Sequence, residues 1–149
     1  MATIHLPPDF KEFLQLLNKH RVEYLIVGGY AVGYYGYPRA TGDMDIWIAF
    51  HPDNLRSLVA TLREFGFAVA EPAEGFLREG QFVGLGNQPL RIEILTSISG
   101  VSFQECYAAR TDEEIDEVQV SFIGLRQLKI NKQASGRLKD LNDINNLPE

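Results

Sequence analysis

The sequence is poor in cysteine and contains no long apolar run. Cys106 is the single cysteine among 149 residues, so no disulfide can form within the chain, and a lone thiol fits a reducing cytoplasm. No stretch of about 18 consecutive apolar residues occurs, so we expect no helix that spans a membrane. Residues 1–10 show no basic segment followed by an apolar one, so we expect no signal peptide. These absences predict a cytoplasmic protein that does not bind a membrane.

Basic residues are also in the minority. The chain has 14 Lys and Arg against 20 Asp and Glu, a formal net charge of −6, which argues against broad, non-specific binding of nucleic acid. The basic residues are unevenly distributed, however, and one group lies near the C-terminal end. Its members are Arg126, Lys129, Lys132, Arg137 and Lys139. This group can form a cationic wall beside a phosphate site even in an acidic protein.

The remaining composition is that of an ordinary globular domain, with 45% apolar and 23% charged residues. A chain of 149 residues is long enough for one substantial core. We therefore expect residues 1–149 to form a single domain, with its core in about 10–123 and helices over about 125–147. We see no internal repeat, low-complexity segment or linker in the sequence.

Apolar periodicity and turn residues predict the order of the elements. Helices are expected at 9–20, capped by Asp9, at 29–35, from 53 to a stop at Gly66, at 102–110, and from 125 onward with a break at Ser135-Gly136. Strands are expected at 21–27, 43–50, 67–70, 81–85, 90–95 and 118–123, with 81–85 and 90–95 joined as a hairpin. This order of elements predicts an α+β (mixed α/β) fold.

One stretch carries the features of a phosphate site. Residues 24–27 are apolar and typical of a buried strand, and Gly28-Gly29 directly after them allow a tight turn without a Cβ. The short helix that follows begins with free backbone N–H groups, which can receive a phosphate. The stretch therefore predicts phosphate binding near Gly28 and Gly29.

The next strand carries two acids on one face. Side chains alternate along a strand, so Asp43 and Asp45 share a face while the apolar residues between and after them point the other way. Two carboxylates about 6–7 Å apart can converge on one or two divalent ions, and without a cation their approach to an apolar strand is costly. Glu93 is expected beside them if its strand pairs next to theirs. Glu71 and Glu79 are the alternatives, in poorer strand context.

This arrangement resembles the nucleotidyltransferase superfamily that includes polymerase-β-like enzymes. The shared features are the Gly28-Gly29 turn, a short helix, Asp43-x-Asp45 on a strand, and a third acid on a later strand, here Glu93. The finer patterns resemble the minimal AbiEii-like group, which is linked to abortive infection and toxin systems. They are Gly-Gly-x-Ala, Arg-x-Thr-x-Asp-x-Asp, and the C-terminal Lys132-x-Ala-x-Gly-Arg137-x-Lys139-Asp140-x-x-Asp143-Ile144.

The resemblance implies a nucleotidyltransferase-like mixed β-sheet flanked by helices, with a helical C-terminal segment. It implies that Asp43, Asp45 and Glu93 are the catalytic acids and hold Mg²⁺, with Mn²⁺ as an alternative. The residues that it implies for NTP binding are Gly28, Gly29, Tyr30, Arg39, Thr41, Lys132 and Arg137. Tyr30 stands where many relatives place a serine whose hydroxyl helps to hold the triphosphate.

The implied activity is transfer of a nucleoside monophosphate from an NTP to a hydroxyl acceptor, with release of pyrophosphate. The AbiEii-like resemblance implies tRNA or another RNA as the acceptor and allows an antitoxin partner. A small molecule or a protein hydroxyl would require the same catalytic centre. Two other interpretations stay open: a catalytically silent protein of this fold that binds a nucleotide or a partner protein, and a metal-dependent phosphohydrolase that uses the same acids.

Several side chains near these motifs have two interpretations. Arg39 either neutralises the acids or contacts a phosphate, and Thr41 is expected to hydrogen-bond within its turn. Lys132 is either a solvated helix residue or a contact to the triphosphate, and Asp143 is expected to pair with Lys139 along one helix face. The tyrosines at positions 30, 34, 35 and 37 are expected mainly in the core, with stacking on a nucleobase as the alternative.

Overall fold

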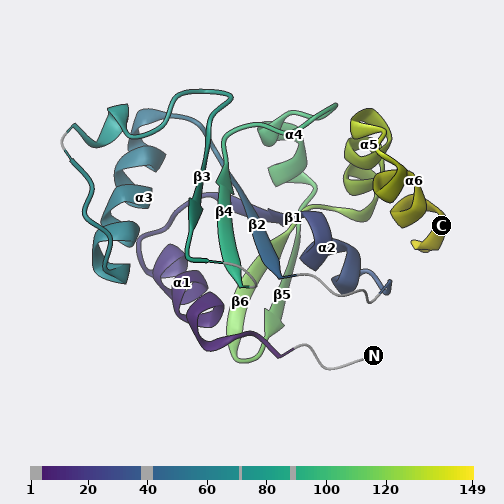
Figure 1. The fold of residues 1–149 in the computed structure, drawn as a ribbon, viewed down its shortest axis with the longest axis horizontal. Coiled ribbons are helices and arrows are strands. Elements are labelled where there is room, and N and C mark those ends of the chain that lie inside the picture. The colour runs from purple at the N-terminus through teal and green to yellow at the C-terminus, as the bar shows by residue number, and fades with distance from the viewer. Residues whose placement is uncertain (1–4, 38–41, 71, 88–89) are drawn as a thin grey trace.

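The computed structural model describes residues 5–37, 42–70, 72–87 and 90–149, which form one six-stranded sheet with helices on both faces (Figure 1). The helices are α1 (Pro8–Lys19), α2 (Gly28–Tyr34), α3 (Pro52–Phe65), α4 (Phe103–Ala108), α5 (Leu125–Ser135) and α6 (Leu138–Asn146), with a 3₁₀ turn, η1, at Ala73–Gly75. The strands are β1 (Tyr24–Val27), β2 (Asp43–Ile48), β3 (Phe82–Leu85), β4 (Arg91–Leu95), β5 (Thr111–Ile115) and β6 (Val118–Phe122). None of these helices is long and apolar enough to cross a bilayer.

The sheet is mixed, as the sequence predicts. Its strand order is β3-β4-β2-β1-β6-β5, with β1 antiparallel to β2, and β2 parallel to β4. The hairpins β3–β4 and β5–β6 form the two ends of the sheet. Because β1 runs opposite to β2 and β4, the turn after β1 lies beside the first residues of both. The predicted phosphate turn and the predicted acids therefore meet at one edge of the sheet.

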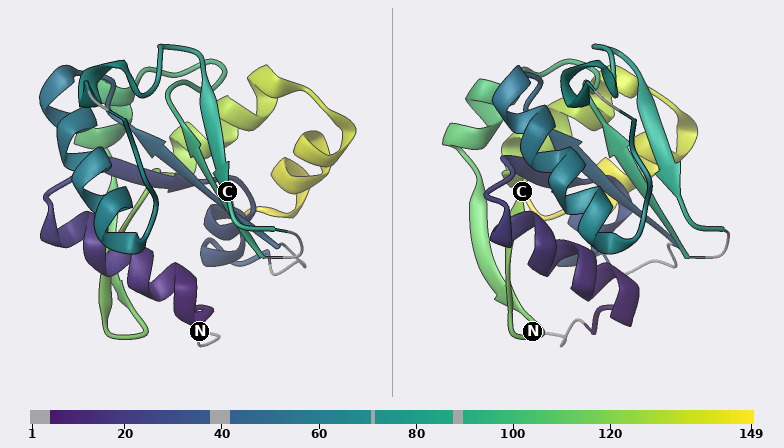
Figure 2. Two further views of the ribbon diagram at one scale, coloured as in Figure 1. Left: turned by 60° about the vertical axis from the view of Figure 1, so that its left-hand side comes forward. Right: turned by 90° about the vertical axis from the view of Figure 1, so that its left-hand side faces the viewer.

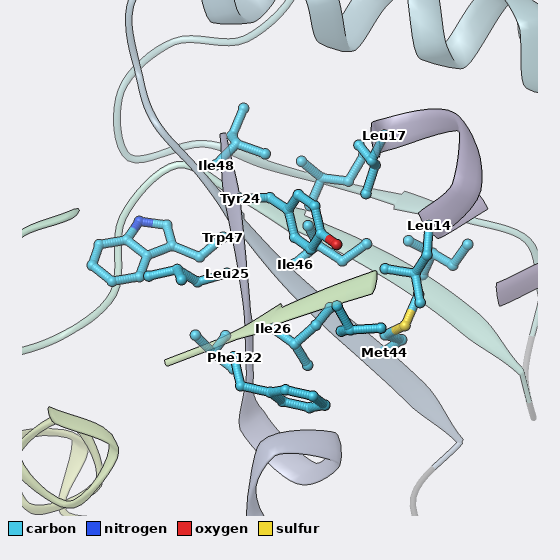
Figure 3. Close-up of a cluster of buried hydrophobic side chains, with 14 of the residues drawn as sticks. Leu14, Leu17, Tyr24, Leu25, Ile26, Met44, Ile46, Trp47, Ile48 and Phe122 are labelled. Carbon is cyan, nitrogen blue, oxygen red and sulfur yellow. The ribbon is translucent and has the colours of Figure 1, made fainter. Parts of the chain in front are cut away.

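Apolar side chains of β2 are buried on both faces of the sheet. The helices α1 and α3 cover one face, while α5 and α6 lie beyond the other (Figures 1 and 2). Figure 3 shows the side chains that face α1 together with their partners on that helix: Met44, Ile46, Ile48, Leu14 and Leu17. On the opposite face Trp47 is 2% exposed, and its ring meets Phe103 of α4 edge-on, with 5.1 Å between centroids. The alternation predicted for β2 is therefore confirmed, and its acids lie at the end not covered by this packing.

Helix ends in this fold follow from local chemistry. Gly66 and Gly136 have left-handed φ values of +109° and +66° and end α3 and α5, as glycine after a helix commonly does. His51 caps α3, because its Nδ1 accepts a hydrogen bond from the Asn54 N–H at 3.3 Å. The other ring nitrogen of His51 lies 2.8 Å from Oε1 of Glu23. His51 is thus fully engaged in holding the start of α3.

Two local predictions are wrong. Residues 67–70 form no strand, because the segment turns back along α3: the Val69 carbonyl accepts a hydrogen bond from Arg63 of that helix at 2.8 Å, and the Phe67 ring stacks on Phe65. Asp9 does not cap α1. Pro7 occupies the capping position and Pro8 the first turn, where a missing N–H costs nothing.

One strand is absent from the sequence-based prediction. β5 has the sequence Thr-Asp-Glu-Glu-Ile, and acidic residues are disfavoured in strands. It forms because it pairs with β6 at the edge of the sheet, where its charges reach solvent. Asp116 and Glu117, which connect β5 to β6, have φ values of 50° and 70°, as a two-residue hairpin turn of type I′ requires.

Candidate active site

Strand register brings the three predicted acids together. Asp45 of β2 is paired with Val27 of β1 on one side and with Glu93 of β4 on the other. Asp43 is on the same face of β2, opposite Arg91 in the register. The parallel pairing of β2 with β4 is the condition on which the choice of Glu93 depended. Glu79 lies instead on the loop before β3, and Glu71 falls outside the described residues.

The Asp45 carboxyl is the electrostatic centre of this group. Its pKa is raised from 3.8 to about 6, first by burial, then by the negative charges of Glu93 and Asp43. Lys132 and Lys139 act in the opposite direction but do not compensate. Ionised Asp45 is therefore held at a cost in the protein alone, and a cation beside it would relieve that cost.

The glycine turn lies directly against this acid. Gly28 has a φ of +66°, and a Cβ added to it would overlap Oδ2 of Asp45. Gly29 is buried at the first turn of α2, and both glycines line the same cavity as Asp43 and Asp45. Gly28 is thus required both for its backbone conformation and for the space that it leaves.

The side chain of Tyr30 does not line the cavity that holds the acids. Its ring meets Phe10 of α1 edge-on at 5.7 Å between centroids, and burial raises the pKa of its hydroxyl. Tyr34, Tyr35 and Tyr37 also pack against the core, as expected, and Tyr34 stacks on Phe122 at 4.1 Å. In the described part of the chain, no tyrosine lines the cavity that holds the acids. Arg39 and Thr41, also expected there, lie outside the described residues.

Lys132 is buried, contrary to the interpretation of a solvated helix residue. Its side chain is 6% exposed, and Nζ lies 3.3 Å from Oδ1 of Asp140 and 3.1 Å from Oδ2 of Asp143. Both aspartates belong to α6, which packs on α5. Asp143 is 1% exposed, and it is buried against Lys132; its expected pairing with Lys139 stays a prediction. The lysine is a fixed cation at the wall of the cavity.

Arg137 extends this cationic wall toward solvent. Its Nε donates to Oδ2 of Asp140 at 2.7 Å and its Nη2 to Oδ1 at 3.2 Å, a forked pair. Hydrogen bonding to Asp140 is the main cause of the raised pKa of Arg137, and the negative charge of Asp45 raises it further. Burial alone would raise the pKa of Asp140, but Arg137 and Lys132 together hold it below its usual value. Asp140 thus orients two cations at once.

A cavity of about 320 Å³ joins the acids to this wall. Its sheet side contains Gly28, Gly29, Asp43 and Asp45, and its helix side contains Asn131, Lys132, Arg137, Lys139 and Asp140. The segment after β4 supplies the rest of the wall, with Leu95, Ser97, Ile98 and Ser99. Opposite charges therefore face each other across a space that is open to a nucleotide-sized polyanion.

Sequence reasoning missed part of this lining. Ser97 and Ser99 continue the alternation that puts Glu93 and Leu95 on one face, so that pattern could have found them. Arg91, which alternation also puts on the Glu93 face, lies beside the acids and not in the cavity lining: its Nε is 3.8 Å from Oε1 of Glu93. Asn131 carried no signal, because its role depends on a tertiary contact: its Nδ2 donates to the Ser99 carbonyl at 3.0 Å.

The acid group fits a hard divalent cation in its chemistry. No three Asp, Glu, His or Cys side chains within the described ranges form a complete metal site by themselves. Asp43, Asp45 and Glu93 nevertheless offer oxygen ligands, and the raised pKa of Asp45 reflects first its burial and then the repulsion of Glu93 and Asp43, both of which a bound cation would offset. Mg²⁺ is commonly held by one or two carboxylates together with substrate phosphates. An incomplete set of protein ligands is what such a site would present before its substrate binds.

A glycine turn that meets paired acids at the edge of a mixed sheet, opposite cationic side chains, is characteristic of nucleotidyltransferases. The chain belongs to the family described as "Nucleotidyltransferase of unknown function (DUF6036)", whose model matches residues 5–147. No curated protein matches it in sequence. The family match confirms the superfamily resemblance drawn from the motifs. The narrower AbiEii-like resemblance is not tested and stays a prediction.

Solved structures share the fold at low sequence identity. The lincosamide antibiotic adenylyltransferase LnuA, in its lincomycin-bound structure, has a TM-score of 0.60 at 15% identity, with 95% of each chain covered. The putative nucleotidyltransferase TM1012 from Thermotoga maritima has a TM-score of 0.59 at 15% identity, over 91% of this chain and 86% of its own. An antigenic nucleotidyltransferase-like protein from Paracoccidioides brasiliensis has a TM-score of 0.55 at 19% identity, over 91% and 72%. At these identities the likeness establishes the fold.

Proposed function

We propose that the chain transfers a nucleoside monophosphate from an NTP to a hydroxyl acceptor and releases pyrophosphate. The observation that carries this proposal is the cavity in which Asp43 and Asp45 face Lys132 and Arg137. Acids alone would suit a bare metal ion, and bases alone a bare phosphate. The two groups facing each other suit a metal-bound polyphosphate, because its metal ion needs carboxylates and its phosphates need cations.

The phosphate side of the reaction would depend on the glycine turn and the cations. Gly28 and Gly29 allow the backbone at the start of α2 to approach the triphosphate closely. Lys132 and Arg137 would stabilise the charge that develops on the leaving pyrophosphate. Because Asp140 binds both cations before any ligand arrives, they need little reorganisation when it does. Arg39 and Thr41 stay candidates for further phosphate contacts.

The acceptor side would depend on the acids. A divalent ion, Mg²⁺ or Mn²⁺, would polarise the α-phosphate and lower the charge between the reactants. Asp43 and Asp45 would hold that ion, and Glu93 would complete its ligands or accept the proton of the attacking hydroxyl. The new bond joins the acceptor oxygen to the α-phosphorus. The bond from that phosphorus to the pyrophosphate oxygen breaks.

The nature of the acceptor separates two forms of this proposal. The AbiEii-like resemblance favours tRNA or another RNA, with an antitoxin as a regulatory partner. The structural likeness to LnuA, an antibiotic adenylyltransferase seen with lincomycin, favours a small hydroxylated molecule. A protein hydroxyl would use the same centre.

Transfer of label from α-phosphate-labelled NTPs tests this function. The protein is incubated with each NTP and Mg²⁺, with total RNA, protein or a small-molecule extract as acceptor. We expect labelled product from the wild type and at least a hundredfold less from Asp43→Asn or Asp45→Asn, because transition-state charge loses its main stabilisation. Asp112→Asn, at an exposed acid of β5, is the matched control and should stay active.

The alternatives give different results in the same experiment. A phosphohydrolase would consume NTP at full rate with no acceptor present, whereas a transferase needs the acceptor. A catalytically silent protein would bind Mg·NTP in calorimetry without any labelled product. Full activity of Asp43→Asn or Asp45→Asn would refute the assignment of these acids.

A further inference from the structure

A second cavity, of about 490 Å³, lies beside the first. It is bounded by the end of β2, by α4, and by the loop of residues 78–81. Ser97 lines both cavities, so the two are neighbours along the same face of the sheet. Trp47 lines the second cavity and follows Asp45 by two positions on that face, which puts it about 6–7 Å farther along the strand.

Trp47 of the cavity wall has a hydrogen-bond donor with no partner in the described part of the chain, but the donor atom is buried below the cavity surface. Nε1 of Trp47 is buried and finds no hydrogen-bond partner within the described residues, although an indole N–H can only donate. The Trp47 ring lies on the side of β2 away from Leu14 and Leu17 (Figure 3), where it meets Phe103. Such orphan donors are rare in folded proteins. This one is not exposed to the cavity, so Trp47 offers the cavity apolar surface and no donor.

The two cavities differ in charge, because the first contains both acids and cations and the second, in its described lining, lacks cations. No Lys or Arg is found among the described residues that line the second cavity, and Glu79 is its single carboxylate. His51 also lines it, but both ring nitrogens of His51 already bind Asn54 and Glu23. A polyphosphate or an RNA backbone would find no counter-charge here. A neutral molecule needs no counter-charge, and a cationic molecule would find one in Glu79.

Glu79 is held at this cavity by a specific anchor. Thr96, which is 5% exposed, accepts a hydrogen bond from the Gly80 N–H at 2.8 Å and donates to the Gln81 carbonyl at 2.8 Å. One buried hydroxyl therefore ties the two residues that follow Glu79 to the end of β4. The carboxylate is consequently carried by a fixed loop, which suits recognition of a ligand.

We propose that this second cavity binds the acceptor, and that the acceptor is a small hydroxylated molecule that carries an amine. The proposal rests on the nucleotidyl transfer proposed above. The amine would meet Glu79, and an apolar face would cover Trp47 and Phe103. The reacting hydroxyl would then point past Ser97 toward the α-phosphate. Its oxygen bonds to phosphorus, its proton passes to Glu93, and pyrophosphate leaves from the first cavity.

Fractionation of the acceptor pool tests the size class. Extract of the source cells is separated by ultrafiltration into small molecules and retained macromolecules, and each fraction is incubated with protein, Mg²⁺ and labelled NTP. We expect label in the small-molecule fraction alone. Label on RNA or protein would support nucleotidyl transfer and overturn the small acceptor. No label in any fraction would refute the transfer itself, and the acceptor proposal with it.

Two variants test the location. Glu79→Gln should raise the KM for the labelled acceptor about tenfold or more, because one charge-assisted contact is lost, with the KM for NTP unchanged. Gln104→Trp, on the α4 wall of the cavity, should abolish transfer by filling it. The control is Gln15→Trp, at an exposed glutamine of α1 on the opposite face of the sheet, which should stay active.

Binding of Mg·NTP to these variants decides what the cavity holds. Calorimetry should show the same affinity in wild type, Glu79→Gln and Gln104→Trp, since the triphosphate site is the other cavity. Weaker binding of Mg·NTP by Gln104→Trp would mean that the nucleobase occupies the second cavity. An unchanged acceptor KM in Glu79→Gln would likewise overturn the proposal.

Discussion

Gly28 and Asp45 are in such close contact that residue 28 has no room for a side chain: a Cβ there would overlap Oδ2 of the carboxylate. The two residues are 17 positions apart, yet the antiparallel pairing of β1 with β2 places them side by side. The turn proposed to hold phosphates is therefore built against the acid proposed to hold their metal ion. A displacement of Gly28 therefore also displaces the Asp45 carboxylate.

Replacing Gly28 by alanine should damage both stability and binding. The left-handed φ of +66° costs a residue with a side chain about 1–2 kcal/mol, and the new Cβ displaces Asp45. Urea unfolding should report the loss of stability, and calorimetry the loss of Mg·NTP affinity. Gly33→Ala is the control, because a Cβ at position 33 meets nothing within 4 Å. In a helix that change should stabilise by about 0.5–1 kcal/mol. Equal behaviour of the two variants would contradict the close contact.

Without divalent ions, the stability of the fold should depend on pH through Asp45. Its pKa is raised from 3.8 to about 6 in the folded protein, so between these values the folded state binds more protons than the unfolded state. Stability contributed by this group is therefore present at low pH and lost as pH rises toward 6. Asp45→Asn should be more stable than wild type at pH 7.5, by at most about 2–3 kcal/mol. The difference should shrink near pH 4.

Urea unfolding of both proteins in EDTA, across this pH range, measures that difference. Adding Mg²⁺ with an NTP should stabilise the wild type and leave Asp45→Asn little changed, because the ion binds where the charge was removed. If the stability difference grew as pH fell, the raised pKa would be refuted.

Lys132→Met should be strongly destabilising. Asp140 and Asp143 are buried and each lies within 3.3 Å of Nζ of Lys132, and loss of one partner from a buried ion group costs about 3–5 kcal/mol. The matched change is Lys129→Met on the same helix, which should shift stability by less than about 0.5 kcal/mol. Thermal unfolding compares the two. Similar melting temperatures would show that the buried aspartates do not depend on Lys132.

Cys106 should be unreactive in the native protein. Its side chain is 0% exposed, and burial, with the nearby Glu105 as the lesser cause, raises its thiol pKa to about 11. Little thiolate is present at neutral pH, and reagents cannot reach it. A thiol-specific chromogenic reagent should react at once in urea but only slowly without it. Rapid native labelling would show that α4 opens readily.

Alternation along two strands was enough to predict much of the site. Asp43 and Asp45 had to share a face because Met44 and Ile46 fill the core, and β4 shows the same alternation around Glu93. The stops at Gly66 and Gly136 followed from the chemistry of helix ends. These are local rules, and each works from a few neighbouring residues.

The remaining features depend on contacts that no local rule specifies. Lys132 and Asp143 lie 11 positions apart on different helices, and only the packing of α6 on α5 brings them together and buries them. β5 forms from acidic residues because β6 offers an edge. Ser97 and Asn131 enter the site through the path of the chain after β4. In each case tertiary pairing overrides the local preference.

Trp47 is the single tryptophan of the chain, and it is part of the wall of the second cavity. All indole emission from this protein therefore originates in that wall, two positions along β2 from Asp45. A molecule bound against the Trp47 ring in the second cavity should shift the colour of the emitted light, while a nucleotide in the first cavity should change it less. The protein thus carries its own optical reporter, and a fluorimeter can follow the order in which its ligands arrive without any added dye.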